Sequence, residues 1–408
     1  MQAVSPPSDS HNGIASFLRM KSLTIRNLGP LAEARVEFLQ KNLIIGLQSS
    51  GKSCILKTAC HCSWVEKRIE MVQSADEFQE SAYFIDSLAE YHGMKDYVCE
   101  DTFIEYETPQ LHFSYDHATR HFSFRWGKNR WQYRRPKISY VPSDRNLVAA
   151  IPMWSKLQLE NDHLLDFMTD WNIARHAVSK IDNVLNLGLS YWYEPSSNKD
   201  SIVLPSGRTI RLSEGSSGVQ SLMPLFVHLQ YLFDSQYREK NEFRQNYEQK
   251  EEGRQLMQML ADHVSDGARV PPGEGSMVRA DGMSFYFNSP DKSRQFEKLL
   301  ASYLQTQRNE IYLEEPEDNL FPPTQCQLVD WLLEKSSTRD NKNMLFVATH
   351  SPYVLNEFIK RNASEYRLFV TYPAPDKGKF KVKTLSPEEM HEIYDNGVDL
   401  FFNFEAYL

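Results

Sequence analysis

One glycine-rich segment has the residue types and spacing that bind the phosphates of a nucleotide. It reads Gly46-Leu47-Gln48-Ser49-Ser50-Gly51-Lys52-Ser53 and matches the pattern G-x-x-x-x-G-K-[ST] at every position. The glycines let backbone N–H groups turn inward toward phosphate oxygens, and the segment ends on a predicted helix N-terminus, which favours an anion. Lys52 would reach the β- and γ-phosphates, and the Ser53 hydroxyl would occupy one Mg²⁺ position. With the next residue, Cys54, these residues form the predicted ATP and Mg²⁺ site.

Two adjacent carboxylates follow a short apolar segment far along the chain. Glu314 and Glu315 come directly after Ile311-Tyr312-Leu313. Ligands bind α/β sheets at the carboxyl ends of such buried strands. Glu314 would hold Mg²⁺, directly or through water, and Glu315 would polarise the water that attacks the γ-phosphate in line.

A histidine ends a second apolar segment of the same kind. His350 follows residues 344–348, and it lies 35 residues after Glu315 (350 − 315). At the end of a core strand its side chain could hydrogen-bond the γ-phosphate and sense its loss. We therefore assign the catalytic residues as Lys52, Glu315 and His350, with Ser53 and Glu314 as the metal ligands.

The elements that must position these residues predict an α/β fold, a P-loop NTPase. Strands are expected at 21–28 and 34–46, and the end of the second has the continuous apolar run of a strand buried on both faces. A helix is expected from about 52 to 72. Later in the chain, buried strands at 310–314 and 344–348 alternate with helices at 323–334 and 352–361. Residues 367–372 and 379–383 are expected to form a closing hairpin.

The rest of the chain is predicted to form lobes on one composite head. An antiparallel β meander at about 101–141 is expected from four alternating segments, at 102–107, 110–115, 120–126 and 129–135. A helical lobe is expected at about 155–192, and a helical insertion at about 236–305. Residues 1–19 are expected to be a flexible tail. Residues 20–408 are expected to be a single head, because Lys52 and Glu314 are 262 residues apart (314 − 52) yet must share one site.

Composition excludes several classes of protein. The apolar fraction of 41% and charged fraction of 24% are those of a globular chain rather than a disordered one. No stretch approaches 18 consecutive apolar residues, so we expect no membrane partner. Five sparse cysteines form no disulfide framework, which predicts a reducing, cytoplasmic location. The net charge of −9, from 45 basic and 54 acidic residues, confines any nucleic-acid contact to a local patch.

The combination of motifs resembles the ABC-type ATPases of the SMC/RecF/OLD group. Residues 25–30, Ile25-Arg26-Asn27-Leu28-Gly29-Pro30, look like the opening of these proteins. Residues 314–322 resemble their Walker B motif and D-loop, and residues 348–352 resemble their H-loop. Ser216-Ser217-Gly218-Val219-Gln220 is similar to the ABC signature, although Ser213-Glu214-Gly215 is a second possible register.

This resemblance implies an ABC-ATPase-like head that dimerises head to tail on ATP. The signature of one subunit would close on the ATP of the other, through Ser217, Gly218 and Gln220. Ser217 would cap the following helix, whose N-terminus would face the γ-phosphate.

The sequence departs from the family pattern in three places. Glu314 stands where an Asp is usual. The Q-loop glutamine is not evident, and residues 140–145 take its place, with Arg145 able to reach a phosphate. The signature lies 97 residues before Glu314 (314 − 217), which is why residues 236–305 are interpreted as an insertion.

The chain resembles standalone ATPase subunits of bacterial anti-phage systems such as Septu, PARIS and some retrons. Only 58 residues follow His350 (408 − 350), and they hold no nuclease motif, so a separate effector protein, a nuclease or toxin, is expected. The alternatives are a RecF-like DNA-repair ATPase and a nucleotide-sensing scaffold with little turnover.

One basic strip bears on nucleic-acid binding. Residues 120–137 contain seven basic side chains, no acidic ones and five aromatic rings. They could form a nucleic-acid surface with stacking rings. Alternatively, the rings pack on the core and the basic groups face water, and this second interpretation is favoured.

Overall fold

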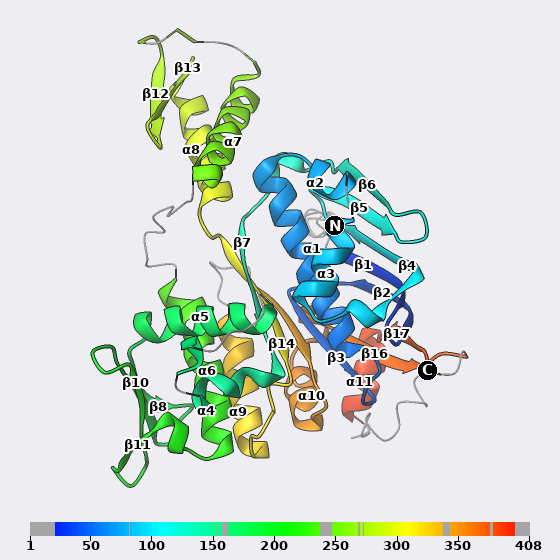
Figure 1. Ribbon diagram of the computed structural model, residues 1–408, viewed down its shortest axis with the longest axis vertical. Coiled ribbons are helices and arrows are strands. Elements are labelled where there is room, and N and C mark those ends of the chain that lie inside the picture. Colours follow the sequence, from blue (N-terminus) through cyan, green and yellow to red (C-terminus); the bar gives the residue numbers. More distant parts are fainter. Residues whose placement is uncertain are drawn as a thin grey trace, which may run out of the picture.

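A computed structural model describes residues 21–80, 82–151, 153–156, 162–236, 247–267, 270–271, 273–337, 343–375 and 378–395. The expected tail, residues 1–19, lies outside the described residues. The central feature is a sheet of 11 strands in the order β6-β5-β4-β1-β2-β17-β16-β3-β15-β14-β7 (Figure 1). With helices on both of its faces, it confirms the predicted α/β class.

Half of this sheet is parallel and carries the predicted site. Its strands are β16 (Tyr366–Pro373), β3 (Lys41–Gly46), β15 (Met344–Ala348), β14 (Arg308–Glu314) and β7 (Pro136–Val141). The other half is mainly antiparallel. Its strands are β17 (Phe380–Thr384), β2 (Leu31–Glu37), β1 (Ser22–Leu28), β4 (Val98–Glu107), β5 (Leu111–Asp116) and β6 (His121–Trp126). Strands β16 and β17 form the predicted closing hairpin.

Two hydrophobic cores lie on opposite faces of the sheet. Alternate residues of one strand enter different cores: Ile311 and Leu313 lie in one and Tyr312 in the other. The Tyr312 face is covered by α1 (Lys52–Val72), α2 (Asp76–Gln79) and α3 (Tyr83–Tyr91). The opposite face is covered by α4 (Leu147–Ala150), α5 (His163–Ala177), α6 (Ser217–Gln230), α9 (Pro322–Ser336), α10 (Pro352–Ile359) and α11 (Pro387–Asp395).

The predicted strand at 34–46 is two strands, β2 and β3. The Asn42 side chain holds the turn between them: its Oδ1 accepts from the Leu39 N–H at 2.8 Å and its Nδ2 donates to the Leu39 carbonyl at 2.8 Å. A turn closed by a side chain leaves the hydrophobic pattern intact, so periodicity alone does not reveal it.

The meander has three antiparallel strands, not the predicted four. Residues 129–135 contain a short 3₁₀ turn at Arg130–Gln132, and the chain then enters β7, which pairs in parallel with β14. The backbone around Arg135 bonds outside the meander: its N–H donates to the Ser302 carbonyl at 2.9 Å, and its carbonyl accepts from the Gln307 N–H at 2.9 Å.

The rings of the basic strip pack inward. Phe122 is 2% exposed in the α1-side core, and Phe124 and Trp126 pack against that core. Trp131 stacks on His263 with ring centroids 4.5 Å apart. These contacts favour the second interpretation, in which the rings pack on the protein, although Phe124, Trp126 and Trp131 are only partly buried.

The predicted helical lobe at 155–192 is mixed rather than helical. After α5, the chain forms a four-stranded antiparallel sheet of β8 (Lys180–Val184), β9 (Leu189–Glu194), β10 (Lys199–Val203) and β11 (Thr209–Arg211). Buried and more exposed side chains alternate around Tyr191 and Tyr193, which are both buried. This period of two predicts a strand, and the helical periodicity of the preceding segment does not extend into it.

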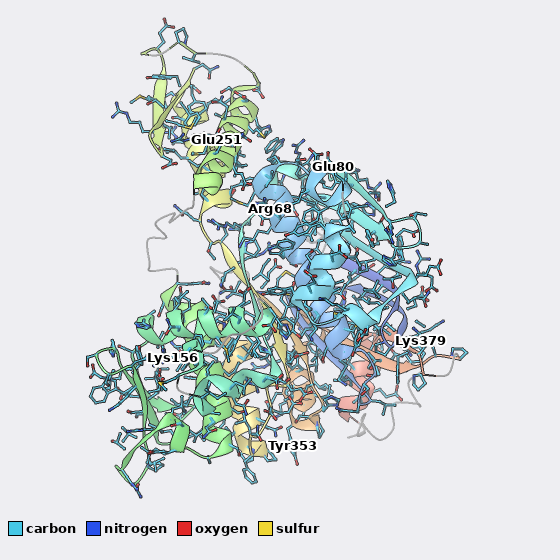
Figure 2. The ribbon with its side chains drawn as sticks, in the orientation of Figure 1. Arg68, Glu80, Lys156, Glu251, Tyr353 and Lys379 are labelled. Carbon is cyan, nitrogen blue, oxygen red and sulfur yellow. The ribbon has the colours of Figure 1, made fainter. Side chains whose placement is uncertain are left out.

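The predicted insertion forms an arm, here residues 247–304, that projects from the head (Figure 1). It contains α7 (Tyr247–Ser265), a hairpin of β12 (Ser276–Ala280) and β13 (Met283–Phe287), and α8 (Pro290–Leu304). The hairpin corrects the expectation of a helical insertion, and residues 237–246 lie outside the described part. Arg68 of α1 contacts the arm through Glu252, at 3.0 Å, beside the labelled Glu251 (Figure 2).

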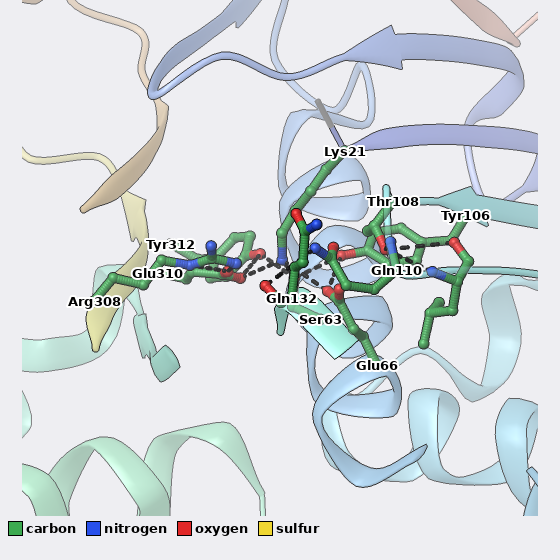
Figure 3. Close-up of polar contacts among 11 residues, drawn as sticks. Lys21, Ser63, Glu66, Tyr106, Thr108, Gln110, Gln132, Arg308, Glu310 and Tyr312 are labelled. Carbon is green, nitrogen blue, oxygen red and sulfur yellow. Dashed lines mark hydrogen bonds and ion pairs between the residues drawn. The ribbon is translucent and has the colours of Figure 1, made fainter. Parts of the chain in front are cut away.

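A buried ionic network joins the first strand, α1 and β14 (Figure 3). Lys21 Nζ lies 3.0 Å from Glu66 Oε2 and 2.7 Å from Glu310 Oε2. Arg308 donates to the other oxygen of Glu310 at 2.8 Å, and the Tyr106 hydroxyl donates to Glu66 at 2.9 Å. Each buried charge therefore has an opposite charge in contact.

Within the described residues, no helix combines the length and apolar character needed to cross a membrane.

Candidate functional site

The phosphate-binding segment connects β3 to α1 and needs both of its glycines. Gly46 has φ 147°, and a Cβ there would lie 1.8 Å from Thr371 Oγ1. Gly51 has φ 95°, and a Cβ there would lie 2.6 Å from the Leu31 side chain. The close approach of neighbouring side chains and the positive φ angles both require glycine.

Lys52 lies over this loop at the start of α1. Its Nζ donates to the carbonyls of Gly46 at 3.1 Å and Leu47 at 2.8 Å. Burial lowers the pKa of Lys52 to about 8, although the charges of Glu315 and Glu317 oppose the shift. Lys52 and the acidic residues thus share one electrostatic site, as the sequence interpretation requires.

The other loop residues divide into accessible and inward-facing groups. Leu47, Gln48, Ser49 and Ser53 are exposed. Ser50 is buried, and its Oγ contacts the Leu47 carbonyl at 2.7 Å and Thr371 Oγ1 at 2.5 Å. The Cys54 thiol is directed to the Leu28 carbonyl at 3.7 Å, and burial raises its pKa to about 12. Both side chains therefore serve the protein's interior, and the prediction that Ser50 and Cys54 bind nucleotide rests on their backbone N–H groups.

The two adjacent carboxylates lie where β14 ends. Glu314 is 7% exposed and pairs in register with Ala348 of β15. Glu315 follows with φ 42°, and its N–H donates to the Ala348 carbonyl at 2.8 Å. Burial, followed by the charges of Glu317 and Glu314, raises the pKa of Glu315. A half-exposed carboxylate with a raised pKa matches what a base facing a water needs.

His350 lies beside Glu315. Its Nε2 is 3.6 Å from Glu315 Oε1. Burial, together with the charge of Lys52, lowers the pKa of His350, so the ring is neutral at physiological pH. The structure therefore brings Lys52, Glu315 and His350 into one site, from the ends of three neighbouring parallel strands.

Glu317 is a site residue that sequence reasoning did not single out. Its Oε1 accepts from the His350 backbone N–H at 2.7 Å. Burial raises the pKa of Glu317, although this hydrogen bond opposes the shift. It thus joins the loop after β14 to the loop after β15. Its place two residues after Glu315, at the end of the same strand, was the available signal.

Arg145 does not face the phosphate site. It is fully buried, and its guanidinium donates to the carbonyls of Glu314 at 2.9 Å and Glu315 at 2.7 Å, and to Pro142 at 3.2 Å. The expectation that Arg145 reaches a phosphate is corrected: it fixes the backbone of the acidic pair, because all of these contacts are to carbonyls.

The signature-like segment lies at the start of α6. The helix begins at Ser217, and its cap is Ser216, whose Oγ accepts from the Val219 N–H at 3.4 Å. The expectation that Ser217 caps the helix is therefore wrong by one residue. Ser217 is exposed, a Cβ at Gly218 would lie 3.0 Å from the Asn319 carbonyl, and Gln220 donates to the Ser213 carbonyl at 3.0 Å.

The residues present fit a nucleotide-borne Mg²⁺. Ser53 offers an exposed hydroxyl and Glu314 a carboxylate, which are hard oxygen donors. No cluster of three or more His, Cys, Asp or Glu suited to a metal occurs among the described residues. The protein's donor set therefore suits an ion that keeps waters and phosphate oxygens as its other ligands.

Comparisons with known proteins give structural relatives only. No protein-family profile matches the chain, and no curated protein matches it. Among solved structures, the SMC head domain from Thermotoga maritima has 13% identity and a TM-score of 0.41, over 90% of this chain and 100% of that one. An SMC head bound to the C-terminal winged-helix domain of ScpA has 10% identity and a TM-score of 0.43, over 91% and 99%.

A third similar structure is the recombination mediator RecF, with 12% identity and a TM-score of 0.30, over 90% of this chain and 97% of that one. In the chain itself, a phosphate-binding loop joins β3 to α1, and two carboxylates end the strand β14. The chain therefore has an α/β fold in which the G-x-x-x-x-G-K-[ST] motif lies between a strand and a helix.

Proposed function

We propose that this protein is a Mg²⁺-dependent ATPase that dimerises head to tail on ATP and controls a separate effector. The observation that carries the proposal is the convergence of Lys52, Glu315 and His350, with His350 Nε2 3.6 Å from Glu315 Oε1. Residues 298 apart in the chain (350 − 52) meet at one edge of the sheet. Structural packing alone does not require three such groups together.

In the proposed mechanism, the loop amides and Lys52 bind the β- and γ-phosphates. Ser53 and Glu314 would hold Mg²⁺, which would supply positive charge to the phosphates. Glu315 orients the attacking water and accepts its proton. Neutral His350 would donate a hydrogen bond to the γ-phosphate, and Glu317 would set its place through the backbone.

The proposed dimer rests on the exposed start of α6. Ser216 and Ser217 face solvent, so the helix N-terminus is accessible to the γ-phosphate on a second subunit. Control of a nuclease or toxin in anti-phage defence is the role proposed for the dimer, by resemblance to standalone ATPase subunits of such systems.

Hydrolysis is tested with Glu315→Gln. This variant keeps the shape of the side chain but loses the base, so kcat should fall by about 10²–10⁴-fold while ATP still binds. Phosphate release and nucleotide binding are measured in parallel. Glu334→Gln, an exposed position on α9, is the matched control and should match the parent. Unchanged hydrolysis in Glu315→Gln contradicts the assignment, and saturable binding without release in the parent favours a nucleotide-sensing scaffold.

The head-to-tail arrangement is tested by mixing two inactive variants. Lys52→Ala lacks a working phosphate loop, and Ser217→Arg blocks the signature surface. In a mixed head-to-tail pair, the intact phosphate loop of the Ser217→Arg subunit meets the intact signature of the Lys52→Ala subunit. The mixture should therefore regain the hydrolysis that neither variant shows alone. If the mixture stays inactive although both variants are folded, this dimer is wrong.

A groove at the base of the arm favours DNA binding as a second function, of the RecF-like kind. It has a volume of about 530 Å³, and its lining includes Lys128, Arg134 and Lys298, all exposed. Three cations in one hollow suit a phosphate backbone. Lys128→Glu with Arg134→Glu should abolish salt-dependent binding of duplex DNA, whereas Lys180→Glu, on the far lobe, should not. Binding that survives the double reversal excludes the groove.

A further inference from the structure

A second cavity lies away from the phosphate loop, on the α1 face of the sheet. Its volume is about 530 Å³. Helix α1 provides Trp64 and Lys67, the segment after α3 provides His92, and β7 provides Tyr140. These α1 residues lie about three to four turns beyond Lys52, so this part of the cavity lies away from the phosphate loop.

Two buried polar groups on its wall lack hydrogen bonds. His92 is 1% exposed, and neither ring nitrogen has a partner in the described part of the chain. Tyr140 is 5% exposed, and its hydroxyl makes no hydrogen bond of ordinary geometry among the same residues, although the Glu314 carboxylate lies close to it. The two rings lie 5.3 Å apart, centroid to centroid. Buried polar groups are nearly always satisfied, so this pair indicates a bound molecule with both donors and acceptors.

A cation on the same wall has no counter-charge in contact. No described residue forms an ion pair or hydrogen bond with the Lys67 ammonium in the structure. Burial, together with the nearby charges of Arg135 and Lys137, lowers the pKa of Lys67 to about 7. An anion beside Lys67 would restore its charged form and the missing interaction.

Aromatic rings and three acidic residues complete the lining of the cavity. Trp64 and Tyr91 contribute rings to its lining. The Asp166 carboxylate is engaged by the Tyr91 hydroxyl, while Asp86 and Glu90 are exposed on α3. Because the acidic residues repel an anion, the anion would bind at the wall that Lys67 forms. The aromatic rings favour a flat ligand.

We propose that this cavity binds a planar heteroaromatic molecule carrying an anionic group, such as a nucleoside monophosphate. The polar edge of its ring would bond His92 and Tyr140, and its anion would lie at Lys67. An aromatic acid shares this chemistry. The position of Tyr140 near Glu314 also places the ligand beside the end of β14, since the Glu314 charge acts on the Tyr140 hydroxyl.

Calorimetry on the full chain tests the proposal. The probes are AMP, GMP, CMP and UMP, with indole-3-carboxylate as the aromatic acid, and adenosine and inorganic phosphate as incomplete ligands. We expect one complete probe to bind more tightly than either incomplete one, because ring and anion are both recognised. Binding is repeated on Lys52→Ala, which removes the phosphate-loop lysine, and should be unchanged there.

Variants of the cavity locate the binding. Lys67→Met should weaken it about tenfold by removing the cation, and Tyr140→Phe by a smaller factor. Lys199→Met, which changes an exposed lysine on β10 outside the cavity, is the control. Melting curves identify any variant that fails to fold. If Lys67→Met fails to fold, Tyr140→Phe still tests the proposal. No binding of any probe, loss of binding in Lys52→Ala, or binding indifferent to both cavity variants would overturn the proposal.

Discussion

Strand β14 has charged groups at both of its ends. At one end the acidic charge is neutralised by contacting cations, and at the other it is not. At the start, Glu310 is fully buried yet contacts Lys21 and Arg308. Burial alone would raise the pKa of Glu310, but these two cations lower it. At the other end, burial raises the pKa of both Glu315 and Glu317, and neighbouring acids add to the shift of Glu315.

The difference separates a structural charge from a chemical one. Glu310 lies in a closed network in which each charge is neutralised. The Glu314–Glu317 segment keeps an excess of negative charge, which the protein's own cations do not balance. Such an excess destabilises the free protein and suits a site completed by a metal ion and polyphosphate.

The largest expected effect comes from breaking the balanced end. Lys21→Met leaves Glu66 and Glu310 buried without their shared cation and should cost about 3–5 kcal/mol of unfolding free energy. Urea denaturation measures this loss. Lys180→Met removes an exposed pair with Asp182 and should cost no more than about 1 kcal/mol. Equal losses in the two variants would contradict the contrast between the ends.

A smaller effect is expected at Arg145, a buried cation that supports the unbalanced end through backbone carbonyls. Arg145→Met removes the donors that hold the carbonyls of Glu314 and Glu315, and should cost about 2–3 kcal/mol. Hydrolysis should also fall, because the acidic pair loses its fixed backbone, and nucleotide binding should fall less. Arg361→Met, which loses a surface pair with Asp330, is the control for stability. Normal turnover in Arg145→Met would show that the acids are positioned without it.

The smallest effect should have the opposite sign and depend on pH. The raised pKa of Glu317 means that its contribution to stability is fully present below the unfolded pKa, near 4.5, and is lost as pH rises through the folded pKa. Glu317→Gln should therefore be more stable than the parent at pH 8, and this advantage should disappear toward pH 4. Urea unfolding at both pH values measures it. A variant that is less stable than the parent at pH 8 would show that Glu317 belongs with the balanced charges.

Sequence reasoning reached the parts of the site that local pattern determines. The phosphate loop and the acidic pair are contiguous motifs at strand ends, and parallel strands bring such ends together. It could not predict where the side chains of Arg145, Ser50 and Cys54 point, because the orientation of each side chain depends on a partner that is distant in the sequence, such as Thr371 for Ser50. The same holds for Arg135, whose backbone bonds to Ser302 of the arm and to Gln307 rather than to the preceding strand.

The Ser50–Thr371 contact has a consequence for synthesis of the protein. The two residues are 321 positions apart, so the phosphate loop lacks this contact until most of the chain has left the ribosome. The Lys21–Glu310 pair, 289 positions apart, sets a similar condition. Because contacts this distant in sequence form late, a nascent or prematurely ended chain has the nucleotide motif without its supports. ATP binding would therefore report that the chain has been made at least as far as Thr371.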